Sequence, residues 1–85
     1  FLDRNLQRLI LNTLAANYPD RTTESQLKEL GSQGDVTKSL LYLSEHGLIT
    51  GGATRSNQGW HITAATITAH GLDIAEDDGG LSAPG

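Results

Sequence analysis

The hydrophobic spacing of the chain changes at Gly47, and this change restricts the folds available to it. Before Gly47 the apolar residues recur every three or four positions, the period of an α-helix that buries one face. The clearest such stripe comprises Leu2, Leu6, Leu9, Ile10 and Leu14. After Gly47 this period is lost, and the segments 48–50 and 60–68 are rich in β-branched residues. The sequence therefore predicts a helical first half followed by β-structure.

Helix-stop and capping residues divide the beginning of the chain into two helices. The first helix is expected at about 3–17, because Pro19 disfavours helical geometry in the residue before it. Residues 23–26 read Thr-Glu-Ser-Gln, which has the spacing of a capping box and indicates the start of a second helix. We expect Gly31 to end this second helix as a left-handed cap.

A third helix is expected after the turn at 31–34, with Asp35 as its N-cap. Gly47 would end this helix. Three apolar residues fall on one side of it and would face the core: Val36, Leu40 and Leu43.

The β-prone segments 48–50 and 60–68 are expected to pair as a hairpin. Between them, residues 51–59 are polar and rich in glycine, which predicts a long, mobile tip. One more short helix is expected at 68–76. Trp60 opens the second strand, and we expect it to pack against the root of the hairpin.

The composition of the 85-residue chain excludes several classes of protein. A chain of this length suffices for one modest core. It contains no cysteine, so disulfides, thiolate zinc sites and cysteine nucleophiles are excluded. There is no apolar run of membrane-spanning length and no secretory leader, so we expect a cytoplasmic protein that does not enter a membrane. Because the chain starts at Phe1 rather than Met, we expect a piece of a longer protein.

The charges are unevenly distributed along the chain. The first sixty residues contain six basic and six acidic side chains, so they carry no net charge. We expect one domain over residues 1–76, followed by a flexible, acidic and glycine-rich tail over 77–85. This balance is not that of a strongly basic nucleic-acid binder. The whole net charge of −4 comes from Asp73, Glu76, Asp77 and Asp78.

The order of the expected elements resembles that of the winged helix-turn-helix domain of bacterial and phage regulators. Residues 36–49 read Val-Thr-Lys-Ser-Leu-Leu-Tyr-Leu-Ser-Glu-His-Gly-Leu-Ile, and the family's third helix commonly ends in Leu-x-x-x-Gly-Leu-Ile. Residues 67–72 read Ile-Thr-Ala-His-Gly-Leu, similar to the family's Leu/Ile-Thr-x-x-Gly after the second strand. The resemblance covers about residues 3–76 and is greatest to small uncharacterised phage or mobile-element proteins. It implies an α+β fold of three helices, a β-hairpin wing and a short C-terminal helix.

The same resemblance implies a DNA-binding module of a prokaryotic or phage transcriptional regulator, with double-stranded DNA as partner and a homodimer as the acting form. The third helix, about 36–46, would be the recognition helix, and 51–59 the wing. Lys38 can meet a phosphate or guanine, Gln33 can pair with adenine, and Arg55, which has no evident structural partner, suits a phosphate or the minor groove. The full set of expected DNA contacts is Lys28, Ser32, Gln33, Thr37, Lys38, Tyr42, Arg55, Asn57 and Gln58.

An alternative is a winged-helix module for protein–protein interaction or dimerisation that does not bind DNA. Leu41 and Tyr42 motivate it, because together with Leu11 they could form an exposed apolar patch. Interface cores favour tyrosine and disfavour charge.

The sequence gives no sign of an enzyme, a metal site or a cofactor. His46, His61 and His70 lack the paired spacing of metal ligands. No serine lies in the context of a nucleophile elbow.

Overall fold

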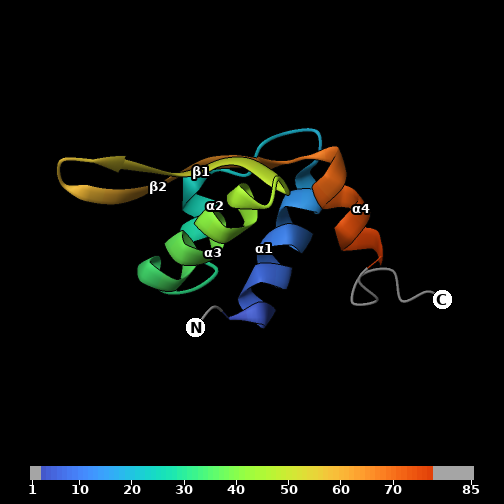
Figure 1. Ribbon diagram of the computed structural model, residues 1–85, viewed down its shortest axis with the longest axis horizontal. Coiled ribbons are helices and arrows are strands. Elements are labelled where there is room, and N and C mark those ends of the chain that lie inside the picture. The colour runs from blue at the N-terminus through green and yellow to red at the C-terminus, as the bar shows by residue number, and fades with distance from the viewer. Residues whose placement is uncertain (1–2, 78–85) are drawn as a thin grey trace.

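The computed structural model describes residues 3–77, which form four helices and a two-stranded antiparallel sheet (Figure 1). The elements are α1 (Arg4–Asn17), α2 (Glu24–Lys28), α3 (Gln33–Glu45), β1 (Ile49–Ser56), β2 (Gly59–Ile67) and α4 (Ala69–Asp77). This is a winged helix-turn-helix fold, as the sequence predicts. The expected tail at 77–85 lies outside the described residues, except for Asp77, which belongs to α4.

Polar side chains cap the first two helices where the sequence indicates. The Asp3 carboxylate accepts the backbone N–H groups of Asn5 and Leu6 and so starts α1. At α2 the predicted capping box is formed: the Thr23 hydroxyl accepts the N–H of Gln26, and the Gln26 side chain accepts the N–H of Thr23.

The junction between α2 and α3 differs from the prediction. The cap of α3 is Ser32, whose hydroxyl accepts the N–H of Asp35 at 3.3 Å. Asp35 therefore lies in the first turn of α3, where its charge suits the positive end of the helix dipole. α2 ends at Lys28, its C-cap Glu29 has right-handed backbone geometry, and Gly31 is not a left-handed cap.

The core lies between the helices and one face of the hairpin. Of the predicted stripe on α1, Leu6, Ile10 and Leu14 are buried, Leu9 is 43% exposed, and Leu2 lies outside the described residues. Around the helix, Ile10, Leu14 and Leu11 follow Leu6 on one side and face the core, whereas Leu9 lies on its other side and faces solvent. The buried apolar residues are Leu6, Ile10, Leu11, Leu14, Leu27, Val36, Leu40, Leu43, Ile49, Ile62, Ala65, Ile67 and Ala75.

The expected long loop at 51–59 is wrong. β1 continues as a paired strand to Ser56, only Asn57 and Gln58 form the turn, and β2 begins at Gly59. Ser56 pairs directly with Gly59, so a two-residue turn closes the hairpin. These residues are polar because the outer part of the hairpin is exposed on both faces, although its two strands are paired.

A bulge in the hairpin places its apolar residues on the core. Gly51 pairs with Ala65 and Ala53 pairs with Ile62, so β2 has one more residue than β1 over this stretch. Ile62 and Ala65 are three positions apart, so in a regular strand their side chains would point to opposite faces of the sheet. The bulge puts both on the buried face together with Ile67.

One threonine ties the end of α3 to the start of α4. Gly47 ends α3 with a positive φ of 74°, as predicted. The Thr68 hydroxyl donates to the Gly47 carbonyl at 2.8 Å and accepts the N–H of Gly71 at 3.0 Å. The Thr68 N–H donates to the Leu48 carbonyl at 3.0 Å. These bonds give a physical reason for the Gly-Leu-Ile and Thr-x-x-Gly motifs.

Candidate nucleic-acid interface

The recognition-helix candidate and the wing candidate protrude on the same side of the domain. α3 packs against β1, and Figure 1 shows its N-terminal end and the hairpin tip directed to the same side. The hairpin extends beyond the helices, which leaves its outer residues exposed. A surface composed of a helix end and an adjacent β-ribbon has the components needed to follow a groove of DNA.

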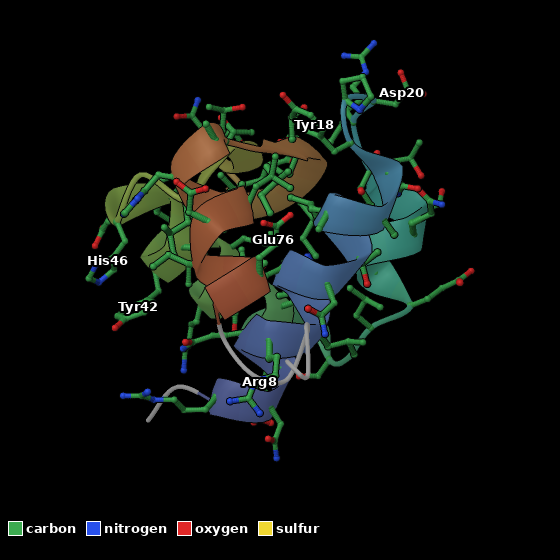
Figure 2. All side chains as sticks on the ribbon, turned by 90° about the vertical axis from the view of Figure 1, so that its right-hand side faces the viewer. Arg8, Tyr18, Asp20, Tyr42, His46 and Glu76 are labelled. Atoms are coloured by element: carbon green, nitrogen blue, oxygen red, sulfur yellow. The ribbon has the colours of Figure 1, made fainter. Side chains whose placement is uncertain are left out.

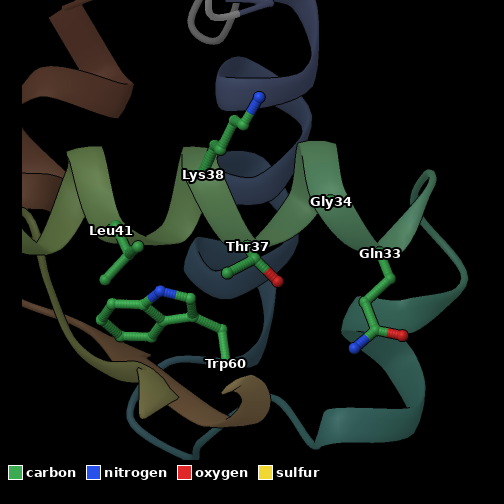
Figure 3. Close-up of a pocket in the computed structure, with 6 residues that line it drawn as sticks. All are labelled: Gln33, Gly34, Thr37, Lys38, Leu41 and Trp60. Atoms are coloured by element: carbon green, nitrogen blue, oxygen red, sulfur yellow. The ribbon is translucent and has the colours of Figure 1, made fainter. Parts of the chain in front are cut away.

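A hollow of about 460 Å³ separates α3 from the hairpin (Figure 3). Trp60, which is 42% exposed, forms one wall from β2, and Leu41 lies over its ring. The rest of the lining comes from α3: Gln33, Gly34, Thr37, Lys38 and Leu41. The structure thus brings three expected contact residues, Gln33, Thr37 and Lys38, around one opening.

Thr37, one of the expected DNA contacts, is largely buried. Its residue is only 7% exposed, because α3 turns this position toward the hairpin. Gln33 and Lys38, by contrast, are exposed at the edge of the hollow. Fewer polar side chains of α3 are therefore exposed for DNA contact than the sequence predicts.

Arg55 has a partner that the sequence interpretation missed. It lies directly opposite Trp60 in the hairpin register, with its Cζ atom 5.9 Å from the centroid of the indole ring. This is the geometry of a cation–π contact. Arg55 is exposed, so its guanidinium is available to solvent while the ring orients it.

The remaining expected contacts are distributed over three places. Ser32 is exposed but serves as the cap of α3, and Asn57 and Gln58 are exposed at the turn of the wing. Lys28 forms an exposed ion pair with Glu24 on the same helix at 2.9 Å. The hydrogen bond and charge of Lys28 lower the pKa of the Glu24 carboxyl.

Tyr42 lies away from the hollow. Its ring centroid is 4.4 Å from that of His46, and Figure 2 shows the two side chains close together. With the buried Leu11, they line a second hollow of about 230 Å³ among α1, α3 and α4. The apolar patch expected from Leu11, Leu41 and Tyr42 is therefore not formed, because Leu41 faces Trp60 instead.

The histidines are dispersed among other contacts. The His61 Nε2 atom lies 2.7 Å from the Ser56 hydroxyl, and the His46 ring contacts that of Tyr42 at an interplanar angle of 53°. Within residues 3–77, no group of three or more His, Cys, Asp or Glu side chains is placed to hold a metal ion. None of the described helices has the length and apolar character needed to cross a membrane.

The sequence analysis did not predict that Trp60 faces α3, although two sequence features indicate it. Gln33, Thr37 and Leu41 are four residues apart and share one helix face. A two-residue turn at 57–58 would have placed Trp60 opposite Arg55.

No protein-family model and no curated protein matches the chain. Among solved structures, the chain is similar to a double mutant of ZitR from Lactococcus lactis, with a TM-score of 0.64 and 23% sequence identity. The match covers 95% of this chain and 53% of the ZitR chain, so the present chain spans about half the length of that protein. The likeness supports the winged-helix fold.

Proposed function

We propose that this chain is the DNA-binding module of a prokaryotic or phage transcriptional regulator, with α3 as recognition helix and the β1–β2 hairpin as wing. The observation that carries the proposal is that exposed Gln33 and Lys38 on α3 line the same hollow as Trp60, which Arg55 of the wing contacts. The winged-helix likeness to ZitR, a protein of about twice this length, supports it.

In this proposal the N-terminal half of α3 enters the major groove. Gln33 can bond the edge of an adenine, and Lys38 can reach a guanine or a phosphate. The Arg55 guanidinium, oriented by Trp60, meets the phosphate backbone or the minor groove. Asn57 and Gln58, at the exposed turn, contact the backbone beside it.

The neutral charge of the first sixty residues sets the kind of binding to expect. Each phosphate neutralised by a cation adds about 0.9 to the slope of log K against log salt. With Lys38 and Arg55 as the principal phosphate contacts, the slope of one domain is about 2. Base contacts must then contribute much of the affinity, so we expect the module to bind best as part of a dimer.

Replacing Lys38 and Arg55 together with alanine is expected to weaken duplex binding about tenfold or more and to lower the salt slope by about 2. The measurement is fluorescence anisotropy of a labelled mixed-sequence duplex at several low salt concentrations. Both residues are exposed, so the double variant should fold.

The matched control is the double variant Arg4→Ala/Arg21→Ala. It removes the same charge from exposed positions on α1 and the loop before α2, away from the hollow. We expect it to keep most of the affinity of the parent chain. Equal losses in the two double variants would show that only net charge matters and would contradict the proposed interface.

A second candidate function is self-association without DNA binding. One large apolar side chain, Ile74 on α4, is exposed at the hollow that Leu11 and Tyr42 also line. If this face joins two copies, the variant Ile74→Glu should lower the mass measured by analytical ultracentrifugation to that of a monomer. A stable oligomer that ignores duplex DNA at low salt would favour this candidate over the first.

A further inference from the structure

The hollow between α3 and Trp60 has features of a small-molecule site. Its volume of about 460 Å³ falls within the range of ligand pockets in proteins. Its walls are the flat indole of Trp60, the side chain of Leu41 and the stem of Lys38, and Gly34 has nothing within 4 Å of the position a Cβ would take. Flat apolar walls with open space between them favour a planar ring.

Two polar groups in this hollow have no partner within residues 3–77: the Thr37 hydroxyl and the Trp60 indole N–H. Both face the space between α3 and the hairpin in Figure 3. The Thr37 hydroxyl opens to the hollow, so an acceptor on a ligand can bond it in place of water. The Gln33 amide lies farther along the same opening and can donate as well.

The charged groups lie outside the hollow. The Lys38 ammonium points away from Trp60 in Figure 3, and the Arg55 guanidinium lies over the indole ring, opposite Trp60 in the hairpin register. The groups that face the ligand space are therefore neutral, with donors in the majority. This chemistry suits a neutral ligand with a hydrogen-bond acceptor rather than an anion or a cation.

From these observations we infer that the hollow binds a neutral, planar aromatic molecule of one or two rings that carries a carbonyl-type acceptor. Its ring lies against the indole of Trp60 and Leu41, and its acceptor meets the Thr37 hydroxyl. A bound ring would occupy the space between recognition helix and wing. This step rests on the function proposed above: a ligand bound in the hollow excludes DNA from the same surface.

Benzamide is a suitable probe, because it has one aromatic ring and one amide. Trp60 is the sole tryptophan of the chain, so a single indole N–H resonance reports on the site. We expect millimolar benzamide to shift this resonance and the amide resonances of Gly34 and Thr37 in a saturable manner. Absence of saturable shifts at these three positions would overturn the inference.

Replacing Thr37 with valine tests the hydrogen bond, since it removes the hydroxyl and keeps the shape. Benzamide binding is expected to weaken about fivefold, whereas toluene, which has no acceptor, should bind Thr37→Val at least as well as the parent. The control Thr54→Val, at an exposed position on β1, should leave both probes unaffected. Equal benzamide affinity in Thr37→Val and the parent chain would overturn the assigned contact.

The competition is measured separately, by adding benzamide to the complex of the chain with labelled duplex. Release of duplex in the concentration range that saturates the Trp60 shift supports exclusion. Retention of duplex at saturating benzamide overturns exclusion. A chain that binds benzamide and never binds duplex contradicts the proposed function, while the ligand site stands on the resonance shifts alone.

Discussion

Replacing Gly71 with alanine is expected to lower the free energy of unfolding by about 3 kcal/mol, which corresponds to a fall in Tm of about 15 °C for a domain of this size. A methyl group at this position would overlap the carbonyl oxygen of Leu48 and press on the side chain of Ile67 at 2.7 Å. The carbonyl is backbone and cannot rotate away. α4 would have to move from the end of β2, and the Thr68 hydrogen bonds would weaken with it.

The measurement is urea unfolding followed by circular dichroism, with Gly34→Ala as the matched control. Gly34 is also a helical glycine, but a Cβ there meets nothing within 4 Å. Alanine favours a helix over glycine, so Gly34→Ala should be about 0.5 kcal/mol more stable than the parent. A Gly71→Ala variant as stable as the parent would show that α4 does not need this close approach.

The second large effect is expected at the bulge of the hairpin, where Gly51→Ala should cost about 3 kcal/mol. Gly51 has a φ of 76°, a conformation that costs an alanine about 1 kcal/mol or more. Its Cβ would also lie 2.6 Å from the carbonyl oxygen of Ala64, on the partner strand. To relieve this contact the strands must separate at the point where the bulge sets the direction of the wing.

Gly47→Ala separates the two causes. Gly47 has nearly the same φ, 74°, but open space around the position of a Cβ. We expect it to lose about 1 kcal/mol, from backbone strain alone. The difference between the two variants, measured by urea unfolding, is the contribution of the close approach to Ala64. If Gly51→Ala and Gly47→Ala lose equal stability, the bulge tolerates a side chain and the expected crowding is wrong.

Much of the fold was predictable because its signals are local. The stripe on α1, the capping box at 23–26 and the end of α3 at Gly47 each depend on residues within a few positions of one another. The cap of α3 was assigned wrongly because Ser32 and Asp35 are both good cap residues, and only the geometry of the preceding turn decides between them.

The hairpin was predicted less well, because its polar composition resembles that of a loop. The glycines of β1 suit the bulge, and its polar residues suit strands that are exposed on both faces. Local β-propensity reflects neither feature. The candidate site depends on the same non-local geometry. The sequence pointed to Gln33, Lys38 and Arg55, but the contact of Arg55 with Trp60 follows only from the strand register.

The Thr68 bridge has a mechanical consequence for the domain. The Thr68 side chain bonds both Gly47, which follows α3, and Gly71 in the first turn of α4, so these two segments are held together directly. A force that displaces α4 must therefore break one of these bonds or drag the C-terminal end of α3 with it. A displacement of α4 is therefore coupled, through Thr68, to the residues that end α3.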